Sequence, residues 1–251
     1  MLRIRKEQNK ELAKVALKRF EDSIVEHVKK FFTKFYEISG ESIVRSTIQL
    51  AVTRAEAYGF ISERDVCYYI NLMFLLGSNF DNDPQLPWVG AILNDKAINH
   101  PGTKAKKLYD ETLAYLDKVA GPNDEHFKRA LLKVSDIQLD NLSHSPAPNI
   151  EKTVSAHFQR VWPEKYKNMG QAILRRLILH GSKSANSYNI TGERGVVTYA
   201  VLMFMLGSGF DSDPLCPWAS AILNDDSIKD QNTRVERLYS EFMVFVNKWL
   251  V

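Results

Sequence analysis

The sequence repeats after 130 residues, and this repeat constrains the fold more than any other feature. The pattern Leu-Met-Phe-x-Leu-Gly-Ser-x-Phe-Asp-x-Asp-Pro-x-x-Pro-Trp occurs at 72–88 and again at 202–218. Between 63–95 and 193–225, 21 of 33 aligned positions are identical without a gap. Unrelated segments would share only a position or two, so the chain contains two copies of one sequence unit.

Apolar residues in each copy recur at helical spacing. In the first copy they lie three or four positions apart, which is typical of an amphipathic helix: Ala16, Phe20, Ile24, Val28 and Phe31. A second helix is expected after Gly40, and a third, capped by Ser62, over 63–76. Only Leu2–Arg5 alternates like a strand. The sequence predicts an all-α fold, a tandem duplication of a ~130-residue helical bundle unit, with unit 1 at 1–130 and unit 2 at 131–251.

Proline and threonine residues suggest where these helices begin and end. Pro163 has no partner in the first copy, where Thr33 is aligned, so a break is expected at this point of the second copy. Thr103 and Thr233 are predicted to cap the last helix of each copy. The segment 143–149, rich in serine and proline, is predicted to be a loop.

Composition and charge exclude several classes of protein. The 251 residues are 45% hydrophobic and 25% charged, with a formal net charge of +3. The basic residues form no long run, which argues against nucleic acid as a partner. No apolar run approaches the ~18 residues that span a bilayer, which argues against a membrane partner. With only two cysteines and no signal peptide, a cytoplasmic location is predicted.

The repeated Phe-Asp-x-Asp-Pro-x-x-Pro-Trp motif has two interpretations. In the first, its aspartates chelate a divalent cation or act as acid and base. An EF-hand is excluded, since Ile92 stands where the bidentate glutamate belongs. In the favoured structural interpretation, the aspartates cap turns and the tryptophans plug the core. If the motif contacts a partner, the candidate residues are Asp81, Asp83, Trp88, Asp211, Asp213 and Trp218.

The histidines and cysteines lack the neighbouring residues that metal binding or catalysis would require. His27 and His157 occupy equivalent positions, but neither has a second histidine one turn away, so hydrogen-bonded helix residues are expected. Cys67 and Cys216 align with aliphatic residues, which favours packing. Phosphate-binding, zinc-protease and serine-hydrolase signatures are missing. We therefore predict a non-enzyme, without catalytic residues, cofactor or metal.

Two stretches resemble a family of small helical bacterial proteins. They are the opening Leu-Arg-Ile-Arg-Lys-Glu-Gln with the helix that follows, and Ser-Glu-Arg-Asp-Val at 62–66 together with Phe-Asp-x-Asp-Pro-x-x-Pro-Trp-Ala at 210–219. Members of this family are encoded beside effectors of the type VI secretion system and their adaptor chaperones. The resemblance implies a non-enzymatic cytoplasmic protein that binds an effector, or the chaperone that loads it. Most members are a single unit long, whereas this chain is duplicated.

Three functional hypotheses follow. The first is a protein-binding adaptor or co-chaperone that assists loading or stability of a type VI effector, its partner being the effector or the adaptor chaperone. The alternative is an immunity protein that neutralises a cognate toxin. The third is a metal-dependent enzyme that uses the Asp-x-Asp-Pro motifs. The candidate binding surface is the groove between the two units, with the exposed parts of the two motifs. The oligomeric state stays open.

Overall fold

The protein is entirely helical in the part of the chain that the structure describes. The computed structural model describes residues 6–137, 139 and 150–250. For residues 6–10 it describes the backbone and not the side chains. These residues form eleven α-helices and two short 3-10 helices, with no strand, which confirms the predicted all-α fold. The predicted strand at Leu2–Arg5 and the predicted loop at 143–149 lie outside the described residues.

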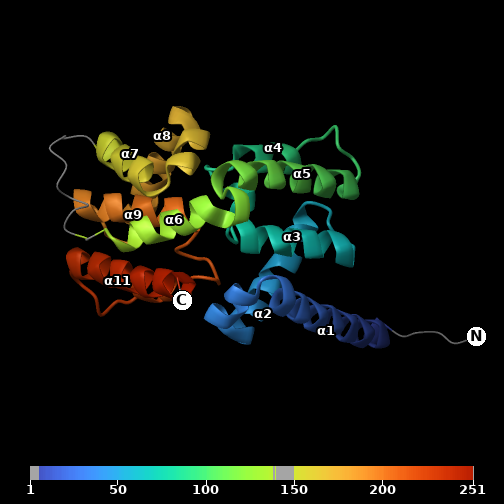
Figure 1. Cartoon of the computed structure of the whole chain (residues 1–251). Helices are drawn as coiled ribbons and strands as arrows, with labels where there is room; N and C mark the ends of the chain where they lie inside the picture. The colour runs from blue at the N-terminus through green and yellow to red at the C-terminus, as the bar shows by residue number, and fades with distance from the viewer. Residues whose placement is uncertain (1–5, 138, 140–149, 251) are drawn as a thin grey trace, which may run out of the picture.

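The helices fall into two groups along the chain, shown in Figure 1. We call the first group the first half: α1 Lys6–Phe31, α2 Thr33–Ala57, α3 Glu63–Leu76, α4 Pro87–Leu93 and α5 Pro101–Val119. The second half comprises α6 Glu125–Ser135, α7 Ile150–Val161, α8 Pro163–Ser187, α9 Glu193–Leu206, α10 Pro217–Leu223 and α11 Gln231–Leu250. The starts of α2 to α5 and of α8 to α11 are offset by the same interval as the sequence repeat. The division into units at 130/131 stays a prediction, and α6 spans it.

The third helix of each sequence copy begins and ends as predicted. Ser62 caps α3, its hydroxyl oxygen accepting from the Asp65 amide at 3.1 Å. At the other end, Gly77 has φ +95° and its amide donates to the Met73 carbonyl. Gly207 ends α9 with φ +98°. Glycine suits both ends because an L side chain rarely adopts this φ.

The predicted caps of the last helices are wrong. The helix α5 begins at Pro101, and His100 Nδ1 accepts from the Gly102 amide at 3.2 Å. At the start of α11, an Asp230 carboxylate oxygen accepts from the Thr233 amide at 2.8 Å. Thr103 and Thr233 therefore lie inside the first turns. The prediction failed because threonine is a common cap, whereas each helix starts three residues earlier than the pattern suggested.

The break predicted at Pro163 is present, but proline is not its only cause. A break separates α7 from α8 at Trp162, and an equivalent break separates α1 from α2 at Phe32, where the next residue is Thr33. The backbone of Phe32 (φ −125°, ψ 42°) resembles that of Trp162 (φ −139°, ψ 76°). Since the same turn forms without proline, Pro163 accommodates a break that the surrounding packing already favours.

Each half surrounds a hydrophobic core of its own. In the first half, Val28, Ile48 and Met73 are fully buried, and in the second half Phe158 and Phe204 stack with ring centroids 4.0 Å apart. Phe31 was expected on the buried side of α1 but is 62% exposed, because it is the last residue before the break and turns outward. None of the described helices combines the length and the apolar character that crossing a membrane requires.

The two halves pack on one another through equivalent helices. The last helix of the first half, α5, packs against α8, and the last helix of the second half, α11, packs against α2. Helices α6 and α7 pack together, and α6 also covers α11. The packing of α5 on α8 and of α11 on α2 places the two Asp-x-Asp-Pro connectors, 77–87 and 207–217, at the junction between the halves.

Candidate functional site

The second aspartate of each connector bonds to the opposite half. An Asp83 carboxylate oxygen accepts from the Ser208 amide at 2.8 Å, and an Asp213 oxygen accepts from the Ser78 amide at 2.9 Å. Both aspartates are buried, with 5% and 4% of their surface exposed. The junction is therefore closed by two reciprocal bonds between a buried carboxylate and a backbone N–H group.

The other oxygen of each carboxylate shapes its own connector. Asp83 accepts from the Gln85 amide and Asp213 from the Leu215 amide, each at 2.8 Å. These turns send the next side chain into the other half. The side-chain Nε2 of Gln85 donates to the Met203 carbonyl at 2.9 Å, whereas the Leu215 side chain packs in the core of the first half. The motif thus interlocks the two halves, which agrees with its structural interpretation.

The glycines that end α3 and α9 allow the connectors to meet. A Cβ atom on Gly77 would lie 3.0 Å from the Leu206 carbonyl oxygen, and one on Gly207 would lie 3.5 Å from the Leu76 carbonyl oxygen. Both contacts are between backbone groups of opposite halves. Glycine therefore supplies the positive φ at both helix ends, and at Gly77 it also allows the close approach of the two backbones.

The first aspartate of each connector bonds within its own half. Asp81 accepts from the hydroxyls of Tyr58 and Tyr69 at 3.0 and 2.9 Å, and its second oxygen lies 3.8 Å from Arg54 Nη1. Burial and the nearby Asp81 charge raise the pKa of Tyr58 to about 12. In the second half, Asp211 accepts from Tyr199 at 2.6 Å. These carboxylates anchor each connector to the helices of its own half.

The tryptophans of the motif do not plug the core, contrary to the expectation. Trp88 and Trp218 are half-buried and pack against the cores from outside. Trp88 lies 6.1 Å from the Tyr115 ring, and Trp218 lies 6.3 Å from the equivalent Phe245 ring. The core positions belong to Phe80 and Phe210, which are 1% and 0% exposed. Both phenylalanines immediately precede the first aspartate, so the repeated Phe-Asp pair was the better signal for the core.

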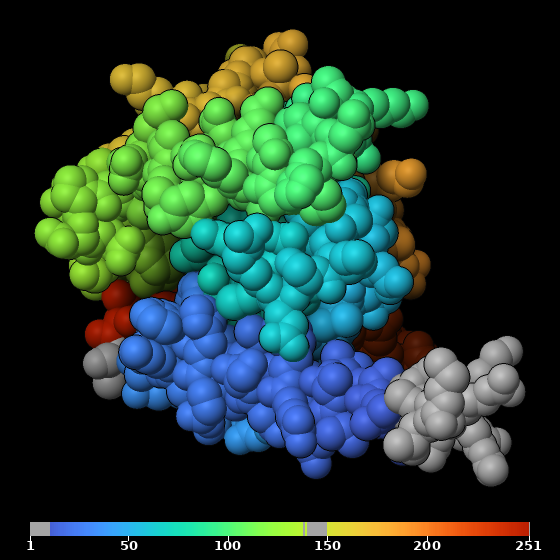
Figure 2. All heavy atoms as spheres, turned by 90° about the vertical axis from the view of Figure 1, so that its right-hand side faces the viewer, coloured from blue at the N-terminus to red at the C-terminus, as the bar shows by residue number. Residues whose placement is uncertain are grey.

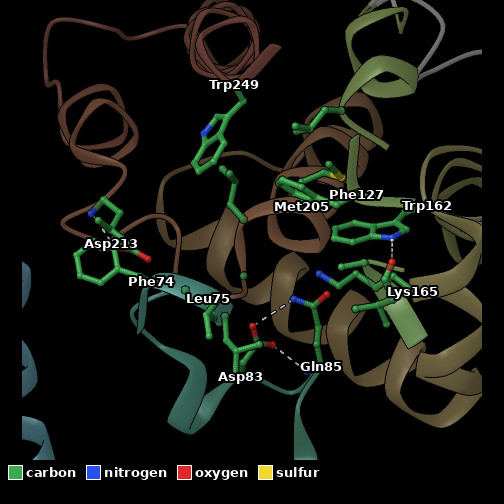
Figure 3. A pocket seen from close by; sticks show the side chains of 18 of the residues that line it. Phe74, Leu75, Asp83, Gln85, Phe127, Trp162, Lys165, Met205, Asp213 and Trp249 are labelled. Atoms are coloured by element: carbon green, nitrogen blue, oxygen red, sulfur yellow. Dashed lines mark hydrogen bonds between the residues drawn. The ribbon is translucent and has the colours of Figure 1, made fainter. Parts of the chain in front are cut away.

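A pocket of about 300 Å³ lies at the junction, and both halves line it. Figure 3 shows Asp83 and Gln85 at one wall, with Phe74 and Leu75 beside them and Trp162, Lys165 and Trp249 from the second half opposite. Further lining residues are mostly apolar, among them Phe35, Tyr115, Leu116, Phe127, Leu206, Leu215, Phe242 and Phe245. Asp83 and Asp213 therefore line the predicted groove, whereas Trp88 and Trp218 do not.

Lys165 is the one lysine or arginine that lines this pocket within the described chain. Its ammonium group donates to the Phe204 carbonyl at 2.5 Å and lies 4.9 Å from the centre of the Trp162 ring. Burial lowers the pKa of this lysine to about 8, and the charge of Asp83 opposes that shift. The equivalent residue of the first half is Phe35, which lines the same pocket. The pocket is thus largely apolar, with the Lys165 cation and the junction aspartates Asp83 and Asp213 among its polar lining residues.

The hydrogen bonds of the two junction aspartates limit their chemistry. Burial raises the pKa of Asp83 and of Asp213, while the bonds from backbone amides oppose that rise. In each, both oxygens already accept from N–H groups. Within the described residues no group of three or more His, Cys, Asp or Glu side chains is placed to hold a metal ion. The arrangement is suited to holding two backbone segments together.

The remaining candidate residues lie away from the pocket or serve packing. His27 Nε2 hydrogen-bonds to the Asn71 side chain at 2.9 Å, which agrees with the expected role of a helix histidine. His157 is buried in α7. Burial raises the pKa of both Cys67 and Cys216, so their thiols stay protonated. Cys216 lines the pocket as an apolar side chain.

Lys165 and Tyr115 were missed at the level of the sequence. A signal existed for Lys165, because it stands where the first copy has Phe35 and so departs from an apolar pattern. Tyr115 gave no signal, since the equivalent residue is the similar Phe245. Comparison of the two copies therefore identifies the cationic side of the pocket but not its aromatic lining.

In comparisons with known proteins, neither a family model, nor a curated protein, nor a solved structure matches this chain.

Proposed function

We propose that this chain is a non-enzymatic protein-binding adaptor, and that the junction pocket receives apolar side chains of its partner. The observation that carries this proposal is the use of the repeated carboxylates. In the pairs that a catalytic interpretation needs, Asp83 and Asp213 accept backbone bonds with both oxygens. Their partners Asp81 and Asp211 accept from tyrosine hydroxyls of their own half. What remains open to a ligand is a largely apolar space of about 300 Å³.

The chemistry of the pocket supports a protein side chain as its ligand. Pockets that anchor a partner are lined by aromatic residues and exclude water from a few buried side chains. Here Phe74, Phe127, Trp162 and Trp249 supply aromatic surface, and Lys165 supplies one cation at the edge of it. A partner residue with an apolar body and an acceptor at its tip would match this arrangement.

The nature of the partner follows from the family resemblance. That resemblance implies a type VI secretion effector or its adaptor chaperone, with the chain acting as a co-chaperone in loading or stability. The alternative role is that of an immunity protein, which would bind the same toxin. Both roles require a protein complex, so the first experiment tests the complex and the second separates the roles.

The complex is tested with the products of the genes adjacent to this one. Each is purified, and its affinity for the chain is measured by calorimetry. Met205→Trp places a large ring at the pocket wall and is expected to weaken binding at least ten-fold. Leu179→Trp is the matched control, because Leu179 is 72% exposed on α8 and does not line the pocket. The proposal fails if no adjacent product binds, or if folded Met205→Trp protein binds as tightly as wild type.

The role is tested in cells that produce the bound protein as a toxin. An adaptor is required for export of the effector and does not rescue a cell intoxicated from within. An immunity protein rescues that cell, and its deletion leaves export unchanged. Rescue without an export defect would therefore favour the immunity role.

A further inference from the structure

One face of the first half exposes a row of large apolar side chains. Tyr68 and Leu75 lie on α3, Tyr109 and Leu113 lie on α5, and between 37% and 44% of each side chain is exposed. We call these four residues the α3–α5 face. Figure 2 shows α5 above α3 on this side of the molecule, with α1 below them. The rings of Tyr68 and Tyr109 meet edge to face at 5.9 Å, beside a small depression between the two helices.

The equivalent positions of the second half are covered. Thr198, which aligns with Tyr68, is 1% exposed, and Tyr239, which aligns with Tyr109, is 8% exposed. Met205 and Met243, which align with Leu75 and Leu113, are half-buried. The two halves therefore differ in whether this face is open, although the underlying helices correspond.

The α11 part of this face in the second half is covered by the amphipathic helix α6, whereas α7 packs against α9. Helix α6 packs against α11 and buries Ala130, Leu131 and Val134, which lie at positions i, i+1 and i+4 of one stripe. Just beyond the end of α6, the Ile137 carbonyl accepts a hydrogen bond from the Tyr239 hydroxyl. The second half thus binds a helix through two features of that helix: an apolar stripe and a carbonyl acceptor just beyond its C-terminal end.

The first half has no such helix over this face in the part of the chain that the structure describes. Its first helix, α1, packs mainly against α2, and residues 11–19 of α1 are all exposed. On α1 the exposed Leu12 and Val15 share one side of the helix, and Leu17 lies on another side. Helix α6 is already bound in its own half, where it packs against α11 and α7.

We propose that the α3–α5 face binds an amphipathic helix of a partner protein in the way that the second half binds α6. The guest helix carries apolar residues at i, i+1 and i+4, and a carbonyl at or just beyond its C-terminal end accepts from the Tyr109 hydroxyl. The proposal rests on the proposed function, since it names the surface and the chemistry through which a protein partner docks. This is helix-in-groove recognition, with α6 as the internal precedent.

The probe for the test is a labelled synthetic peptide with the sequence of residues 123–137, which contains α6. Binding to the full chain is measured by fluorescence anisotropy. We expect saturable binding that weakens at least ten-fold in Tyr109→Glu and in Leu113→Glu, because each places a charge in the apolar face. Tyr109→Phe should weaken binding about five-fold, since only the hydroxyl bond is lost. Val244→Glu is the matched control, as Val244 is 47% exposed on α11.

The possible outcomes separate this site from the alternatives. Absence of binding, or binding that Tyr109→Glu and Leu113→Glu leave unchanged, overturns the proposal. A peptide that displaces the native α6 would respond to Tyr239→Phe instead, which also overturns it. Sedimentation that shows a dimer for wild type and a monomer for Tyr109→Glu would assign the face to a second copy. If an adjacent gene product binds the chain and Tyr109→Glu leaves that affinity unchanged, the inference fails while the proposed function stands.

Discussion

The two halves share the backbone of the junction and differ in the side chains around it. Asp83 and Asp213 make the same pair of bonds, one within their connector and one across to the other half. In contrast, Lys165 replaces the equivalent Phe35 at the pocket, and Ser184 replaces the equivalent Arg54 beside the first aspartate. The matched part holds the halves together, while the divergent part gives the pocket two unlike sides.

This difference indicates where each kind of requirement acts. A buried carboxylate bonded to backbone amides tolerates little change, because removing it leaves N–H groups without partners in a dry interior. A side chain at the pocket wall is constrained by shape and by whatever it meets there. The largest effects on stability are therefore expected at the shared aspartates, and smaller ones at the positions where the halves diverge.

The first prediction removes one reciprocal bond. Asp83→Ala and Asp213→Ala should each lower the free energy of unfolding by about 3 kcal/mol or more. Each change leaves two buried backbone N–H groups, one in each half, without a hydrogen-bond acceptor. Asp83→Ala should cost slightly more, since Asp83 also accepts from the Gln85 side chain at 3.2 Å. Urea denaturation followed by circular dichroism measures both. The exposed Asp226→Ala is the control, and equal stability of all three variants would contradict the reciprocal role of the two aspartates.

The second prediction concerns the cation that only the second half brings to the pocket. Lys165→Met should raise the free energy of unfolding at pH 7 by about 2 kcal/mol, because the folded state no longer buries an ammonium group. In wild type, the folded lysine loses its proton near pH 8, whereas the unfolded one keeps it to about 10.5. Stability due to this group therefore increases as pH rises from 8 to 10.5.

Chemical denaturation at several pH values between 7 and 10.5 tests this slope. Lys165→Met should show less increase of the unfolding free energy with pH than wild type over that window. Lys167→Met, two residues further along α8 and exposed, should keep the slope of wild type. If Lys165→Met is less stable than wild type at pH 7, the bond to the Phe204 carbonyl outweighs the cost of burial.

The third prediction gives the first half the residue of the second half. Arg54 donates to the Ser78 carbonyl at 2.6 Å and faces Asp81, so Arg54→Ser should destabilise the protein by about 1 kcal/mol. Asp81→Asn should then cost less in the Arg54→Ser background than in wild type, because the two charges no longer interact. A double-mutant cycle in urea measures this coupling, and additive effects would show that Arg54 acts through Ser78 alone.

The sequence allowed much of the scaffold to be predicted, but not the junction. Periodicity and glycine signals located α3 and its end at Gly77, because these are local properties of the chain. The bond from Ser208 to Asp83 joins residues far apart in sequence, and no local pattern indicates such a pair. The exposed position of Phe31 has a similar cause, since a break that packing imposes changes the direction of a side chain that periodicity had assigned to the core.

The smallest expected effect tests what breaks the first long helix of each half. Pro163→Thr introduces the residue of the first half and should change the free energy of unfolding by less than about 1 kcal/mol, with the same helix content. The reason is that the turns match. The Phe32 amide donates to Val28 at 2.8 Å, and the Trp162 amide donates to Phe158 at 2.9 Å.

The reverse change, Thr33→Pro, is expected to be tolerated to a similar degree, because residue 33 is the first of α2 and the first amides of a helix have no partner within it. Far-UV circular dichroism and urea denaturation of both variants check the pair. A gain in helix content in Pro163→Thr would show that α7 and α8 fuse once the proline is removed. In that case the break would follow from proline in the second half and from packing in the first, and the two halves would differ in the cause of a shared shape.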